Sequence, residues 1–235
     1  MRRVLGGTLA LLLALGLAAC APADDPEPTP TALTGEQSER LAIARFRNFD
    51  AGVRAIEARI PSTSGDLIVS GWFDYANVAG YAGVTVDEVP SGLVWWNHDL
   101  VATRDVPVDE APLPRPEDGW VSAGLDPSST PLANALALVA SLGADRPENP
   151  QLLAQSDAAW IRADEIGGTA VDVFLGPSGD AATSAPLPET QRARYWIDAT
   201  GLLLRFEFPQ ASDWLVIDFS PGDDVQIAPD LPGAP

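Results

Sequence analysis

Residues 194–209, RYWIDATGLLLRFEFP, contain the clearest secondary-structure pattern in the chain. Strand-forming residues at 195–197 lead into the turn-forming run Asp198 to Gly201, and a second apolar run follows. This pattern predicts a β-hairpin. Strict alternation along its second strand would place a row of large apolar side chains on one face, namely Leu202, Leu204, Phe206 and Phe208. Such a face must be covered, so we expect a second layer of structure over it.

The period-two pattern recurs on both sides of this hairpin. Alternating apolar residues predict further strands at 66–75, 78–87, 92–96, 100–104, 158–166, 169–175 and 214–219. Spacings of three and four predict helices at 35–59, 131–143 and 150–155, and Thr34 with Gln37 forms a capping-box pattern before the first. The Pro-rich, acidic segment 105–119 is expected to be a surface loop. This order of elements predicts an α+β domain built on a long antiparallel sheet.

The first twenty residues have the features of an export signal. Arg2 and Arg3 precede an apolar run at 4–17 that is too short for a convincing membrane span, and the run ends in Leu17-Ala-Ala-Cys20. Leu-Ala-Ala-Cys resembles the bacterial lipobox, in which the cysteine is acylated, with palmitate for example, and becomes the new N-terminus. We therefore predict a lipoprotein signal peptide at 1–19 and lipidation of Cys20, the only cysteine. The alternative is an ordinary secretory signal in which the cysteine stands by chance.

The predicted mature chain has three parts. An acylated cysteine and a Pro-rich acidic tether cover 20–34, a single domain covers 35–222, and a loop tail covers 223–235. Two or more acyl chains would anchor the chain stably at the extracytoplasmic face of the cell membrane. Because only one cysteine is present, the exported domain must be stable without a disulfide.

The chain is strongly acidic. Its net charge is −19, and removal of Arg2 and Arg3 with the signal peptide takes this to −21. Every basic residue is arginine. This charge argues against nucleic acid as a partner and against electrostatic docking on anionic lipid.

The residues for most catalytic and metal sites are missing from the sequence. His98 is the only histidine, which excludes sites that need two, and we expect it to be a solvated turn residue rather than part of a Ser-His-Asp triad. The acidic pairs at 109–110, 117–118, 164–165 and 223–224 lack the spacing of a calcium loop and are expected to be solvated. Phosphate-binding, nucleophile-elbow and dinucleotide motifs do not occur. We therefore predict no enzyme activity, no metal and no cofactor.

Apolar surface is what the sequence offers instead. Seven tryptophans are present, and a broad apolar sheet face under two or three helices can leave a dry space whose natural occupant is an acyl chain. The alternative is a sheet packed tightly on its helices with no cavity. Phe46 and Phe49 suggest an aromatic gate on the first helix, although a packed helix face is the favoured interpretation.

Three segments together resemble a known group of proteins. They are GLVWW at 92–96, DEIGGT at 164–169, and YWIDATGLLLRF at 195–206. Their order in an exported chain with an N-terminal amphipathic helix is similar to the LolA-like superfamily of cell-envelope proteins, including the LppX- and LprG-type lipoproteins. The resemblance implies a curved antiparallel half-barrel with helices over its concave face. It also implies a non-enzymatic role in carrying lipid or acylated glycolipid, with no protein partner specified. The loop 105–119 has no match in that group.

The resemblance implies a ligand cleft between sheet and helices, lined by many apolar residues. Our candidates for its lining are Phe46, Phe49, Phe73, Trp96, Leu136, Val139, Trp196, Leu202, Leu204, Phe206, Phe208 and Trp214. A one-residue shift in strand register would move the candidates of that strand to the other face. The competing hypothesis is an interaction or envelope-sensing module with a closed core and no lipid ligand.

Overall fold

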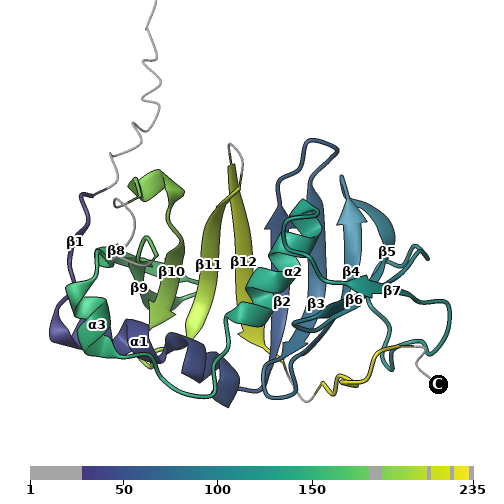
Figure 1. The fold of residues 1–235 in the computed structure, drawn as a ribbon, viewed down its shortest axis with the longest axis horizontal. Coiled ribbons are helices and arrows are strands. Elements are labelled where there is room, and N and C mark those ends of the chain that lie inside the picture. The colour runs from purple at the N-terminus through teal and green to yellow at the C-terminus, as the bar shows by residue number, and fades with distance from the viewer. Residues whose placement is uncertain (1–27, 180–186, 211–212, 223–224, 233–235) are drawn as a thin grey trace, which may run out of the picture.

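The computed structural model describes residues 28–179, 187–210, 213–222 and 225–232. They form one twelve-stranded antiparallel sheet that curves around three α-helices on its concave side (Figure 1). The predicted α+β class, a curved antiparallel sheet with helices over its concave face, is confirmed. We call the face that carries the helices the inner face and the opposite face the outer face. Cys20 and the predicted signal peptide lie outside the described residues.

The elements follow one another mostly as hairpins. The helices are α1 Gly35–Asp50, α2 Pro131–Ser141 and α3 Pro150–Gln155, with a short 3₁₀ helix at Glu189–Gln191. The strands are β1 Thr31–Ala32, β2 Val53–Ile60, β3 Leu67–Asp74, β4 Ala79–Val86, β5 Val89–Trp96, β6 Leu100–Arg104, β7 Val121–Gly124, β8 Ala159–Ile166, β9 Thr169–Leu175, β10 Arg194–Asp198, β11 Leu203–Gln210 and β12 Asp213–Pro221. Their order in the sheet is β1-β8-β9-β10-β11-β12-β2-β3-β4-β5-β6-β7. Pairing of β12 with β2 therefore joins two hairpin series, β2–β7 and β8–β12, into one sheet.

The predicted helix at 35–59 is wrong in its second half. Helix α1 begins with the expected capping box, in which Thr34 and Gln37 bond reciprocally, but it ends at Asp50. Gly52 has φ +69°, a left-handed conformation that stops the helix, and β2 starts at the next residue. The spacing of Val53, Ile56 and Ile60 fits a helix as well as a strand, and pairing with β12 and β3 selects the strand.

The hairpin at 194–209 forms as predicted, but the predicted row of apolar side chains does not lie on a single face. The Asp198 carboxylate closes the turn by accepting from the backbone N–H groups of Thr200 and Leu202. Trp196 pairs with Arg205, whereas Ile197 pairs with Leu203, so the register shifts by one residue between them. This bulge places Leu203 in the core under the helices and sends Leu204 to the outer face.

Both faces of the sheet carry apolar layers. The inner core joins α1, α2 and α3 to the sheet, and its largest fully buried side chains include Phe73, Trp96, Phe174 and Leu136. On the outer face, the segment 105–120 and the tail 225–232 pack over β4–β6 through Val108, Ala111, Trp120, Ile227 and Leu231. Trp95 fixes the tail by donating to the Ala228 carbonyl at 3.2 Å.

Two short edge strands were not predicted. Thr31–Ala32, in the segment expected to be tether, pairs with β8, and Val121–Gly124 pairs with β6. Within the described ranges, no helix has both the length and the apolarity that a membrane crossing requires.

Candidate functional site

The structure brings some of the predicted lining residues together on the inner face. Phe73, Trp96, Leu136, Val139 and Phe206 are buried in the inner core, and Phe49 and Phe208 pack against it while remaining partly exposed. These side chains come from α1, α2 and three different strands, and the curvature of the sheet gathers them under the helices (Figure 1). Their role in lining a lipid site stays a prediction.

The remaining predicted residues lie elsewhere. Trp196 and Leu204 belong to an apolar cluster on the outer face of β8–β10. Trp214 also faces outward, since Leu215 and Ile217 beside it point into the inner core, and the Arg194 guanidinium lies 4.5 Å from its ring centre. Leu202 precedes β11, is half-buried and lines a surface pocket with Leu204. Phe46 is half-buried on α1 and is not part of the three core clusters found among the described residues.

An aromatic strip forms part of the inner face, with Phe206 buried and its two neighbours partly exposed. It consists of Tyr195 on β10 with Phe206 and Phe208 on β11. The Tyr195 and Phe206 rings meet edge to face at 5.0 Å, and Phe206 and Phe208 stack at 6.5 Å. Burial raises the pKa of the Tyr195 hydroxyl to about 12, so the strip is uncharged at neutral pH.

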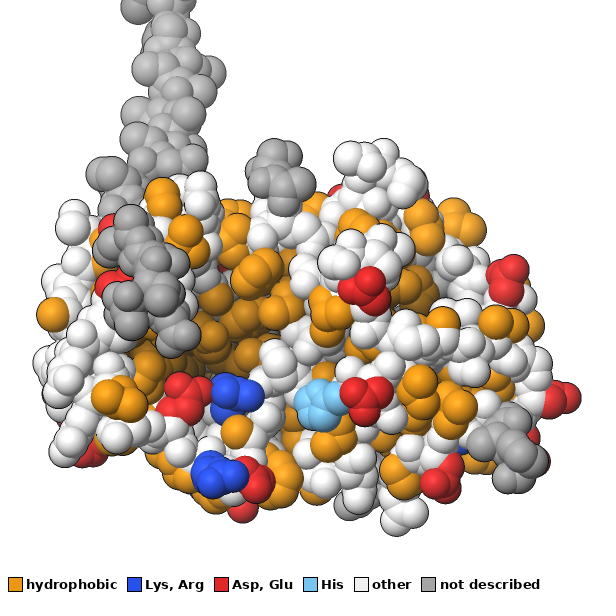
Figure 2. Space-filling model, in the orientation of Figure 1, with side chains coloured by type: hydrophobic (Ala, Val, Ile, Leu, Met, Phe, Trp, Pro, Cys, Tyr) orange, Lys and Arg blue, Asp and Glu red, His pale blue; other side chains and the backbone are white. Residues whose placement is uncertain are grey.

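The aromatic strip lies between the areas covered by the helices. Helix α1 packs against β10 and the start of β11, and α2 packs over β2 and β3. Between these two areas, Figure 2 shows a hollowed hydrophobic surface over β10, β11 and β12.

Helix α2 covers the other part of the inner face with apolar side chains. It has no charged residue, and its buried residues are Ala133, Ala135, Leu136, Val139 and Ala140. Side-chain hydrogen bonds hold it at three places. The Tyr75 hydroxyl donates to the Val139 carbonyl at 3.1 Å, Arg45 donates to the Ser141 carbonyl at 2.9 Å, and Asn134 donates to the Gln210 side chain at 3.2 Å.

A small cavity lies on the inner face beside the first turn of α2. Its volume is about 220 Å³, and its lining includes Val84, Val94, Thr103 and Leu132. Val84 and Val94 belong to the inner core, and Leu132 of α2 packs against that core. This cavity over β4–β6, whose lining also includes Arg104 and Asp105, and the hollow over β10–β12 thus lie on the two sides of α2.

A buried arginine ties α1 to the sheet. Arg54 is 2% exposed and donates to the Asn48 side chain, the Leu203 carbonyl and the Ser220 carbonyl at 2.9, 3.1 and 3.2 Å. Burial lowers the pKa of its guanidinium, an effect that Tyr75 and Asp198 oppose. The pairing of β11 with β12 ends at Arg205 and Asp218, and Arg54 links the two strands just beyond that point. Through Asn48 it also fixes this part of the sheet to α1.

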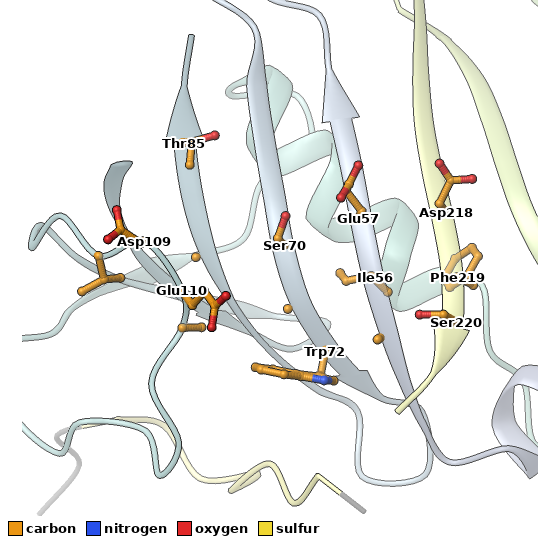
Figure 3. Close-up of a pocket in the computed structure, with 15 residues that line it drawn as sticks. Ile56, Glu57, Ser70, Trp72, Thr85, Asp109, Glu110, Asp218, Phe219 and Ser220 are labelled. Carbon is orange, nitrogen blue, oxygen red and sulfur yellow. The ribbon is translucent and has the colours of Figure 1, made fainter. Parts of the chain in front are cut away.

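A larger cavity of about 620 Å³ lies on the outer face and differs in chemistry (Figure 3). Trp72 lies at one end, and the lining carries carboxylates from Glu57, Asp109, Glu110 and Asp218. Asp218 is paired with Arg205, whose Nε donates to it at 2.6 Å. Solvated carboxylates disfavour an acyl chain, so this cavity suits a polar occupant. The feature of the sequence that belongs to this cavity is the acidic loop 105–119. This loop folds back over the sheet and supplies Asp109 and Glu110 to the cavity lining.

His98 is exposed in the turn between β5 and β6, as expected. Within the part of the chain that the structure describes, no three His, Cys, Asp or Glu side chains are grouped to hold a metal ion.

Comparison with known proteins found similarity only among solved structures. No family model and no curated protein matches the chain. Lipoprotein LppX of Mycobacterium tuberculosis matches with 14% identity and a TM-score of 0.45, covering 77% of this chain and 95% of LppX. LprF of Mycobacterium bovis matches with the same identity and TM-score, covering 84% and 98%. A DUF1329 family protein of Desulfovibrio piger matches with 13% identity and a TM-score of 0.31, covering 78% and 90%. LppX, the first of these matches, bears the name of one of the lipoprotein types that the sequence motifs resemble.

Proposed function

We propose that this chain is a membrane-anchored lipoprotein that binds the acyl part of a lipid or acylated glycolipid on its inner face and catalyses no reaction. The observation that supports this most is the hydrophobic hollow over β10–β12 in Figure 2, together with the uncharged aromatic residues Tyr195, Phe206 and Phe208 on the inner side of β10 and β11. Transfer of an acyl chain from water to such a surface is worth about 0.8 kcal/mol for each buried methylene. A few methylenes therefore suffice for measurable binding.

The acyl chain would lie along α2. The hollow is on one side of this helix and the 220 Å³ cavity is on the other, so an acyl chain that displaced the packed side chains beneath α2 would join the two spaces. No charged side chain on α2 opposes this path. In the similar solved structures, LppX is described as a lipoprotein, which agrees with the proposed setting.

The anchor would be the acylated Cys20. From there, residues 21–30 lead to β1 at the edge of the sheet. Ten Pro-rich residues would span roughly 30 Å if they were extended, enough to hold the domain clear of the membrane surface at its extracytoplasmic side. Acylation can be tested by mass spectrometry of the membrane-extracted chain. We expect the mass of a diacylglyceryl group on Cys20, and none in Cys20→Ala.

Native mass spectrometry tests lipid binding directly. The Cys20→Ala chain, exported and purified in a mild detergent, is expected to retain lipid from the host membrane. Phe208→Ala in this background should weaken retention by about tenfold, because a large apolar contact in the hollow is lost. Val89→Ala is the matched control, since Val89 is 64% exposed at the start of β5. If neither chain retains lipid under any condition, the proposed function is wrong.

A closed interaction module is the second candidate. The observation in its favour is that Phe73 and Trp96 are completely buried, so the layer beneath α2 is packed rather than open. Under this alternative, the purified chain would carry no lipid and its inner-face signals would not respond to added lipid. The native mass spectrum therefore separates the two candidates.

A further inference from the structure

The indole N–H of Trp96 is a buried donor without an acceptor. The side chain is 0% exposed, and its Nε1 has no hydrogen-bond partner in the described part of the chain. Other buried or half-buried indoles do find acceptors: Trp95 donates to the Ala228 carbonyl, Trp160 to Asp172 and Trp196 to Asp164. Leaving such a donor unpaired costs about 1–3 kcal/mol, so the position calls for a compensating role.

The indole cannot turn to find a partner. A Cβ on Gly80, directly opposite on β4, would lie only 2.4 Å from the ring, so the indole rests against the backbone of the sheet. On its other side, the Phe73 ring centre is 5.6 Å away. The packing of the Trp96 indole between Gly80 and Phe73 therefore fixes the direction of its N–H.

The 220 Å³ cavity, which Arg104 and Asp105 line together with several apolar residues, lies beside the same layer. Val94, which lines the 220 Å³ cavity, is two residues before Trp96 and faces the same side of β5. Leu132 of α2 lines the cavity, and Leu136 and Val139 of the same helix share the inner core with Trp96. A chain that enters this cavity and extends along β5 as α2 moves outward would reach Trp96.

We propose that Trp96 Nε1–H donates a hydrogen bond to the ester carbonyl oxygen of an acyl chain bound beneath α2. This inference rests on the proposed function, since it requires lipid on the inner face. Methylenes are bound by any apolar surface, whereas a single buried donor distinguishes an ester, which has a carbonyl acceptor, from an ether, which has none. Trp96 is thus a specificity residue for acyl esters.

A matched pair of lipids tests the proposal. Binding of dipalmitoylphosphatidylcholine and of its dihexadecyl ether analogue, each supplied in detergent micelles, is measured with the Cys20→Ala chain. We expect the ester to bind about three- to tenfold more tightly, the effect of one buried hydrogen bond. Trp96→Phe should remove this preference. Trp72→Phe, which changes an indole on the outer face, should keep it.

The outcomes separate this inference from the proposed function. If the unsubstituted chain binds both lipids equally, the role of Trp96 is refuted while lipid binding stands. If it binds neither, the proposed function fails. An NMR titration covers the case in which Trp96→Phe does not fold. The Trp96 Nε1–H resonance of the unsubstituted chain should move downfield with the ester and not with the ether, and identical shifts with both lipids would overturn the proposal.

Discussion

Arg54 shows how one side chain fixes the geometry of the inner face. It is a buried cation that donates hydrogen bonds to neutral oxygens on Asn48, Leu203 and Ser220. The Arg54 guanidinium carbon also lies 5.5 Å from the centre of the Phe219 ring, which adds a cation–π interaction. Loss of the guanidinium would remove the donor from two buried acceptors, on Asn48 and Leu203, and from the part-buried Ser220 carbonyl.

We therefore expect Arg54→Met to lower the free energy of unfolding by at least about 2 kcal/mol, because buried acceptors lose their donors. Urea denaturation followed by tryptophan fluorescence measures this. Arg59→Met is the control, since its side chain is 56% exposed, and it should change stability by less than about 0.5 kcal/mol. If both substitutions changed the free energy of unfolding equally, the hydrogen bonds of Arg54 would not contribute specially to stability.

Glu207, on the outer face of β11, should make stability depend on pH. Burial raises the pKa of its carboxyl group above the ordinary value, although Arg194 and Arg205 oppose this effect. The folded state then holds the proton more tightly than the unfolded state, so ionisation of Glu207 lowers stability as pH rises above about 4.5. Glu207→Gln should stabilise the chain at pH 7 and have no such effect at pH 3.

Thermal unfolding at the two pH values checks this expectation. Glu57→Gln is the control, since the Glu57 side chain is 56% exposed, and its effect should be small at both pH values. A Glu207→Gln variant that is less stable at pH 7 than the unsubstituted chain would contradict the assignment.

At the scale of elements, α2 is the part of the inner layer whose attachment can be altered most simply. Gln210, at the end of β11, accepts from Asn134 of α2 at 3.2 Å and donates to the Pro61 carbonyl at 3.0 Å. This amide links the first turn of the helix to two strands. If lipid enters beneath α2, loosening that link should ease entry.

Gln210→Ala is therefore expected to increase amide hydrogen exchange in α2 and to speed lipid uptake by a few-fold, since about 1 kcal/mol of hydrogen bonding is lost. Stopped-flow fluorescence with a pyrene-labelled phospholipid measures uptake. Gln151→Ala, which changes an exposed glutamine at the start of α3, is the control. Unchanged exchange in α2 would rule out this link as a restraint on the helix.

Local patterns predicted most elements and missed those that depend on distant partners. The capping box at Thr34 and the turn at Asp198 are encoded within a few residues, and both form as expected. The boundary between α1 and β2 was missed because the apolar spacing of 53–60 suits both structures and strand pairing decides between them. The bulge near Trp196 was missed because a period-two pattern does not show where an extra residue is inserted.

At the scale of the whole molecule, the two faces of the sheet have different chemistry. The inner face combines an uncharged aromatic hollow with a helix that has no charge, whereas the outer cavity carries four carboxylates. The sequence predicted an apolar layer but not this division. It arises because β12 pairs with β2, and because the 105–120 segment and the tail fold over the outer face, which local patterns do not specify.

The central claim is that acyl chains bind on the inner face, and paramagnetic broadening tests it most directly. A phosphatidylcholine with a nitroxide spin label on its acyl chain is added to the Cys20→Ala chain, and methyl NMR signals are followed. We expect strong broadening at Leu136 and Val139 of α2 and little at Val173 and Val108 of the outer face. Broadening confined to the outer face, or absent from both faces, would contradict the account.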